Sequence, residues 1–201
     1  MKIQFLYSQT QEIQRLIDLR LEYPWFAENN FPAIFPKFYN SLCSEKRAIF
    51  KKNLRSQLAS IYDRKLYAIK KDSVRKQWSK IEGEFFAILE QWTKNQKNYI
   101  CHISLYGPQG QFSYPNTITV RAHTKRDVSE INETIAHELI HLLIYKQTRK
   151  LKLNYEQTEI IVDLFFKKTK LKEIFPYYKM QNIPTHIKNP LQLFQSVIRS
   201  L

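Results

Sequence analysis

Residues 134–143 contain two histidines, His137 and His141, with Glu138 directly after the first. Side chains four positions apart lie on one face of an α-helix, so both imidazoles can reach the same metal ion. Glu138 is placed to take a proton from a metal-activated water. The spacing therefore predicts a zinc site that hydrolyses an amide bond, with Glu138 as the general base. The alternative is a buried helix whose histidines only form hydrogen bonds.

A third ligand is expected on the next helix, because no histidine follows His141 until His186. Zinc also accepts carboxylate ligands, and Glu156, Glu159 and Asp163 lie in this segment. Glu159 and Asp163 are four positions apart, so Glu159 can bind the metal while Asp163 accepts a hydrogen bond from the ring N–H of a bound histidine. Glu156 has no acidic residue four positions on. This favours Glu159, with Glu156 as the alternative, and predicts one Zn²⁺ per chain.

The sequence His137-Glu138-Leu-Ile-His141, followed by Glu159-Ile-Ile-Val-Asp163, resembles the paired motifs of the gluzincins, a branch of the zincin metallopeptidases with His, His and Glu as zinc ligands. The small size, with strands just before the first motif, is similar to the minigluzincins. The resemblance covers about a third of the chain, from about residue 99 to residue 170. It implies a zinc metalloprotease, an endopeptidase that acts on peptide or protein substrates.

The same resemblance implies two further features of the site. One is a sheet whose edge strand, expected at residues 116–122, binds an extended peptide as an additional strand. The other is a tyrosine or histidine that stabilises the oxyanion. The candidates for that role are Tyr155, Tyr177, Tyr178 and His186.

The elements around the motif are predicted from residue type and periodicity. Residues 99–106 and 116–122 are rich in β-favouring side chains and flank a turn, which indicates a hairpin. Asp127 or Ser129 can cap a helix over residues 128–147 that carries the motif. The next helix is expected to reach about Lys170, and its predicted capping pair is Asn154 with Gln157.

The first half of the chain is predicted to be mainly helical after an initial strand over residues 2–7. Ser8 or Thr10 can cap the helix that follows this strand. Apolar residues at roughly helical spacing predict a basic amphipathic helix over residues 44–71. Ser73 can begin a second long helix.

Length and composition limit the architecture. The chain has 201 residues, 43% of them hydrophobic and three of them glycine, which predicts a folded globule and excludes collagen-like or disordered sequence. We expect residues 1–98 to form a mainly helical N-terminal region and residues 99–201 a zincin-like catalytic region, within one compact unit. The expected class is α+β, with a small mixed sheet, a hairpin, the HExxH helix and a largely helical remainder.

The charge suggests an alternative function. There are 32 Lys and Arg against 18 Asp and Glu, a net charge of +14. Part of the excess lies on the predicted helices after residue 44, at Lys46, Lys51, Lys52, Arg55, Arg64, Lys65, Lys70 and Lys71. A basic helix face attracts polyanions but is usually just solvated, and no base-reading motif accompanies it. The alternatives are a nucleic-acid or partner-binding protein with a structural or vestigial zinc site, or a protease that cuts one intracellular protein at DNA.

The location of the protein is predicted from its start and its apolar runs. The opening eleven residues become polar too early for a secretory signal, and no apolar run is long enough to span a bilayer. Cys43 and Cys101 have neither zinc-knuckle nor redox spacing, which indicates reduced thiols. We therefore expect a cytoplasmic protein without a membrane partner.

Overall fold

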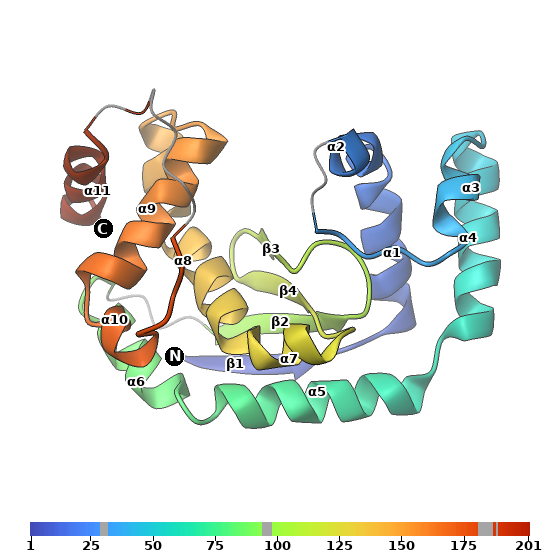
Figure 1. The fold of residues 1–201 in the computed structure, drawn as a ribbon, viewed down its shortest axis with the longest axis horizontal. Coiled ribbons are helices and arrows are strands. Elements are labelled where there is room, and N and C mark those ends of the chain that lie inside the picture. Colours follow the sequence, from blue (N-terminus) through green and yellow to red (C-terminus); the bar gives the residue numbers. More distant parts are fainter. Residues whose placement is uncertain (29–31, 94–97, 181–186, 188) are drawn as a thin grey trace.

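The computed structural model describes a mixed α+β fold in which helices surround a small four-stranded sheet (Figure 1). The sheet has the order β1-β2-β4-β3, with β1 (Lys2–Leu6), β2 (Asn98–Ser104), β3 (Gly110–Ser113) and β4 (Thr117–Arg121). The description covers all residues except 29–31, 94–97, 181–186 and 188. His186, one of the oxyanion candidates, lies outside the described residues. The predicted α+β class with a small mixed sheet is confirmed.

The strand pairing differs from the predicted hairpin. β2 runs parallel to both β1 and β4, so the two runs expected to form a hairpin lie side by side in the same direction. The hairpin is instead formed by β3 and β4, which pair antiparallel from Gly110↔Val120 to Ser113↔Thr117. The sequence of β3, Gly-Gln-Phe-Ser, is too short and too polar to show a strand pattern. β3, and not the predicted 116–122 run, is therefore the edge strand beside the motif helix.

One face of the sheet is apolar because side chains alternate along each strand. Cys101, Ile118 and Val120 are completely buried on this face. Two long helices pack against it: α5 (Arg64–Trp78) contacts β1 and β2, while α8 (Ile131–Lys150) contacts β3 and β4. The helix that carries the motif thus lies directly against the edge strand.

Helices gather at both ends of the sheet (Figure 1). One end carries α1 (Gln9–Leu19), α2 (Tyr23–Glu28), α3 (Tyr39–Cys43) and α4 (Arg47–Ile61), and the other carries α9 (Tyr155–Lys168), α10 (Leu171–Ile174) and α11 (Pro190–Arg199). Two shorter helices, α6 (Glu82–Leu89) and α7 (Lys125–Ser129), precede β2 and α8. The α1–α4 group has a core of its own, which includes Leu16, Tyr39 and Phe50.

Helix boundaries in the first half follow side-chain caps. Ser8 caps α1 as predicted, with its hydroxyl accepting from the backbone N–H of Gln11. The predicted helix over residues 44–71 is two helices, because Asp63 ends the first run and caps α5 by accepting from the N–H groups of Lys65 and Leu66. α5 then continues through Ser73, so the predicted start there is wrong.

The motif helix also begins differently from the prediction. Thr124 caps the short helix α7, and Asp127 is its reciprocal partner at the third helical position rather than a cap itself. The chain then re-enters a helix at Ile131 and continues to Lys150. The predicted capping pair of Asn154 and Gln157 is confirmed at the start of α9.

Two other expectations concern the chemistry of the whole chain. Cys43 and Cys101 are both free thiols, as predicted. None of the helices in the described part of the chain is long and apolar enough to cross a bilayer.

Candidate metal centre

Three side chains from two neighbouring helices converge on one point. His137 and His141 lie one turn apart on α8, and Glu159 lies on α9, which packs against α8. The Nε2 atoms of the two histidines are 3.1 Å apart. Each faces a different oxygen of the Glu159 carboxylate, with His137 Nε2 to Oε2 and His141 Nε2 to Oε1 both 3.2 Å. Two imidazole nitrogens and the two oxygens of one carboxylate thus face a common centre.

The spacing of these atoms fits a tetrahedral metal ion. Ligand atoms about 2.0–2.1 Å from zinc at tetrahedral angles are about 3.3 Å from one another. The 3.1 Å between the two Nε2 atoms is close to that edge length, and each imidazole lies 3.2 Å from one of the two Glu159 oxygens; one ligand atom from each of the three residues can be chosen so that all lie within 4.8 Å of one another. Among the described residues, His137, His141 and Glu159 are the group of His, Cys, Asp or Glu side chains that could hold a metal ion. Two imidazoles and one carboxylate leave a fourth position for water or substrate.

The charges of the three side chains act strongly on one another. Burial opposes the charge of Glu159, but hydrogen bonds with His137 and His141 outweigh it and lower the pKa of this carboxyl to about 2. Burial alone would lower the pKa of His137, yet its hydrogen bond with Glu159 and the nearby carboxylate of Glu138 raise it above its ordinary value.

The far side of the His137 ring meets Tyr178 and Asp163. The Tyr178 hydroxyl donates to Asp163 Oδ1 at 2.6 Å and lies 3.4 Å from His137 Nδ1. The tyrosine is buried, and its ring stacks on Phe166 at 3.8 Å between centroids. The tyrosine hydroxyl lies between the carboxylate of Asp163 and the ring of His137. This row of three polar groups can fix the orientation of the imidazole.

Glu138 lies beside the cluster and against the sheet edge. It is 7% exposed, and burial raises its pKa, although the imidazoles of His137 and His141 and the guanidinium of Arg15 oppose the rise. The neighbouring edge residue Phe112 stacks on the ring of His141 at 4.8 Å and 9°. Strand β3 thus contacts both the carboxylate and a histidine of the motif.

A pocket of about 930 Å³ opens onto these groups. Its lining includes β3, the motif residues of α8, and Tyr155 and Glu159 of α9. Trp25 and Phe26 of α2 also line it, and Trp25 is 46% exposed. Although the whole chain is strongly basic, the described residues that line the pocket carry four carboxylates and one ammonium group. These residues are Glu22, Glu133, Glu138, Glu159 and Lys179.

The structure separates the remaining candidates. Glu156 is exposed on α9 and is not part of the metal-binding group. Tyr177 is 88% exposed and does not line the pocket. Tyr178 lines it but is engaged behind His137, whereas Tyr155 lines it near Glu159 and Glu138.

Several residues of the site carry no signal in the sequence. Trp25 and Phe26 line the pocket and Arg15 acts on Glu138, yet none of the three belongs to a motif with metal-binding or catalytic spacing. Gly110 starts the edge strand, although it lies in the segment between the two predicted strand runs. The one signal at Gly110 is its residue type, because glycine is common where the backbone comes very close to another group.

Zinc affinity is expected to fall as the pH is lowered from 8 towards 6. Zinc binds imidazoles that have lost their proton. Because the pKa of His137 is raised, protons begin to compete with zinc for this imidazole at a higher pH than for an ordinary histidine. Below that pKa, affinity should drop by about tenfold per pH unit for each imidazole that must be deprotonated. Competition with a fluorescent zinc chelator at several pH values measures this.

The exposed His123 provides the control for this titration. His123→Ala should leave the pH dependence unchanged, because the residue lies outside the cluster. An affinity that stays constant between pH 8 and 6 would contradict the involvement of these imidazoles.

Any assignment of function must rest on this geometry and on the motif spacing. The cluster, the buried glutamate and the pocket are all contributed by segments far apart in the sequence, from α2 to α9. Comparisons of the chain with family models, with curated proteins and with solved structures found no match.

Proposed function

We propose that the protein is a zinc-dependent peptidase of the zincin type, with His137, His141 and Glu159 as the metal ligands and Glu138 as the general base. The observation that carries the proposal is the approach of two imidazole nitrogens and a carboxylate to within 3.1–3.2 Å of one another, beside a buried glutamate in a pocket. A purely structural site is usually closed by four protein ligands, whereas three are found among the described residues.

The residues divide the chemistry between them. Zinc held by the three ligands would lower the pKa of a water and polarise the scissile carbonyl. Glu138 takes the proton from the attacking water and delivers it to the leaving amine. Its burial supports this role, because a raised pKa brings the carboxyl closer to neutral pH, where proton acceptance and donation are both efficient.

The free edge of β3 supports an extended peptide as the substrate. In an antiparallel pair, residues alternate between bonding to the partner strand and facing away from it. Arg121 N–H donates to the Gln109 carbonyl, so by the register Gln111 and Ser113 also face β4. The backbone groups of Gly110 and Phe112 consequently face away from β4, at the pocket. A substrate strand can pair there with its scissile bond next to Glu138.

Tyr155 is assigned the stabilisation of the oxyanion. Tyr155 is 63% exposed as a whole, but desolvation of its hydroxyl, together with the carboxylates of Glu159 and Glu138, raises its pKa to about 12, so it keeps a proton to donate at neutral pH. Tyr178 already donates its hydroxyl proton to Asp163. The assignment therefore separates a donor at the pocket from a tyrosine that orients His137.

Tyr155→Phe should lower kcat by about a hundredfold, the usual effect of removing one oxyanion donor. KM and zinc content should change little, because the hydroxyl acts on charge that develops only in the transition state. Steady-state kinetics on dye-labelled casein measure the effect. The matched control is Tyr177→Phe, at an exposed tyrosine outside the pocket, and equal rates for the two variants would rule out Tyr155.

The proposal itself is tested with purified protein and an unfolded substrate. Zinc-loaded protein should cleave dye-labelled casein, lose activity on chelation and regain it when zinc is returned. Protein that binds zinc without cleaving any unfolded substrate would instead favour the structural zinc site of the alternative function.

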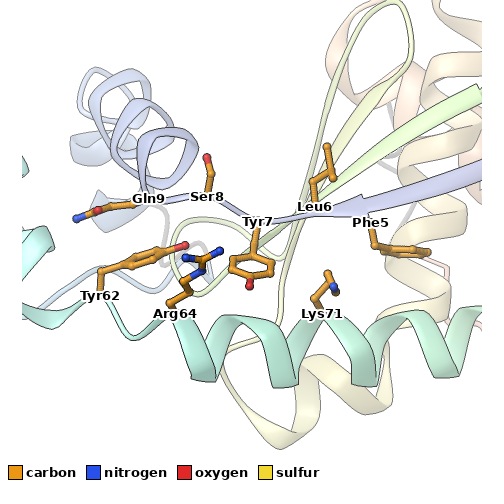
Figure 2. A pocket seen from close by; sticks show the side chains of 8 residues that line it. All are labelled: Phe5, Leu6, Tyr7, Ser8, Gln9, Tyr62, Arg64 and Lys71. Atoms are coloured by element: carbon orange, nitrogen blue, oxygen red, sulfur yellow. The ribbon is translucent and has the colours of Figure 1, made fainter.

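That alternative, nucleic-acid binding, concerns a different part of the molecule. The basic side chains named above lie on or beside α4 and α5, and none of them lines the large pocket. Figure 2 shows Arg64 and Lys71 beside Tyr7 and Tyr62 in a smaller pocket of about 440 Å³ at the end of β1. Lys71 is also paired with Asp72 at 3.4 Å. The basic surface and the metal centre can thus be altered independently.

A further inference from the structure

Gly110 begins β3 where the sheet edge meets the motif helix. A Cβ atom on this residue would lie 2.9 Å from both Cγ and Cδ of Glu138, and closer still to Oε1. Separations under 3.0 Å are essentially never seen for real Cβ atoms, so one of the two groups would have to move. The Glu138 side chain therefore occupies the volume that any side chain at position 110 would need.

The turn that leads into β3 cannot easily withdraw to make room. Arg121 Nη1 donates to the Gly107 carbonyl at 2.8 Å, and Arg15 Nη2 donates to the Pro108 carbonyl at 2.9 Å. The Gln109 carbonyl accepts from the backbone N–H of Arg121 at 2.8 Å. Both arginines are buried, Arg15 at 8% and Arg121 at 6% exposure. Three successive carbonyls are thus fixed just before the strand.

Glu138 has little else to hold its carboxylate in place. Within the described part of the chain no side-chain hydrogen bond of its carboxylate is found, and the charges that attract it are the imidazoles of His137 and His141 and the guanidinium of Arg15. Its position is consequently set by packing between α8 and the edge of β3. A flexible side chain facing a fixed backbone is the partner that will move when space is lost.

We propose that Gly110 is a positioning residue for Glu138, because the side-chain-free start of β3, held by Arg15 and Arg121, leaves the space in which the carboxylate is aligned with the metal centre. The inference rests on the proposed function of Glu138 as the general base. It makes α1, through Arg15, part of the support of the reaction centre, although α1 lies far outside the motif in sequence.

Gly110→Ala is expected to lower kcat by about a hundredfold, within the usual range for a displaced general base. Zinc affinity should remain within about threefold of wild type, because the ligands stay in place. KM should change little, since the added methyl group faces α8 and not the free edge. Gly83→Ala in α6 is the matched control, because a Cβ there meets no atom within 4 Å, and its kinetics should equal those of wild type.

A double-mutant cycle with Glu138→Ala distinguishes positioning from general damage to the fold. Alanine has no atom beyond Cβ, so the methyl group at position 110 no longer meets Cγ or Cδ of residue 138. Glu138→Ala will itself leave only a residual rate of hydrolysis, but adding Gly110→Ala should then lower that residual rate by less than about threefold, which is strong non-additivity between contacting residues. Losses that simply multiply would overturn the proposal.

Crystal structures of zinc-loaded wild type and Gly110→Ala provide a readout that does not depend on activity. The variant should show the Glu138 carboxylate rotated away from the metal centre with β3 in place. An unmoved Glu138 would overturn the positioning role even if wild type is active. If Glu138 is displaced in Gly110→Ala but the wild-type protein has no hydrolytic activity, the contact is supported and the proposed function is rejected.

Discussion

Casein hydrolysis by the Glu138→Gln variant is expected to fall about a thousandfold or more, while the zinc content stays at about one ion per chain. The amide has the size of the carboxyl group, so the packing against β3 is preserved. It cannot accept a proton from the attacking water, and general base catalysis is lost. Steady-state rates and metal analysis on the same preparation measure both parts of the prediction.

Glu133→Gln is the matched control for this experiment. Glu133 lines the same pocket and lies on the same helix, one turn before His137, but it is not part of the metal-binding group. Its substitution should change the rate by less than about tenfold, because no proton transfer is assigned to it. A Glu138→Gln variant that cleaves casein at close to the wild-type rate would refute the peptidase mechanism.

Zinc affinity is expected to fall more than about a hundredfold in Glu159→Ala, which exceeds the usual cost of losing a residue that only orients a ligand. The carboxylate contacts both imidazoles, so its removal opens the centre on the side of α9. Wild type should gain about 2.7 kcal/mol of stability when free zinc is a hundred times its Kd, and the variant should gain far less at the same concentration. Thermal melts with and without zinc test this.

Glu156→Ala supplies the control from the same helix. Glu156 is exposed and lies outside the cluster, so this variant should bind zinc like wild type. Retention of zinc by Glu159→Ala together with its loss in Glu156→Ala would transfer the third ligand to Glu156. Full retention by both would show that a carboxylate from α9 is not needed.

The parts of the site with a strong local signal could be predicted from the sequence. Two histidines at helical spacing place themselves on one helix face whatever the surrounding fold, and His137 and His141 meet as expected. Glu159 was favoured over Glu156 because Asp163 follows it four positions later, and it is Glu159 that reaches the histidines. The start of α9 was also predicted correctly, from the capping pair of Asn154 and Gln157.

The parts that depend on tertiary pairing could not be predicted. Strand direction depends on how many strands the chain forms between two runs. The short strand β3 lies between β2 and β4 in sequence and pairs antiparallel with β4, so β4 runs parallel to β2 instead of forming a hairpin with it. The short edge strand at Gly110–Ser113 is stabilised by β4 and α8 rather than by its own propensity. The role of Arg15 is equally invisible, because its partner, the Pro108 carbonyl, is 93 positions away.

The parallel pairing of β1 with β2 also determines when the centre can form during synthesis. Lys2 pairs with Asn98, so the sheet closes a loop of about half the chain, and contacts of such long range form slowly. Glu159 and Tyr178 leave the ribosome later still. A chain under synthesis therefore cannot complete the group of His137, His141 and Glu159 until α9 has emerged and packed against α8.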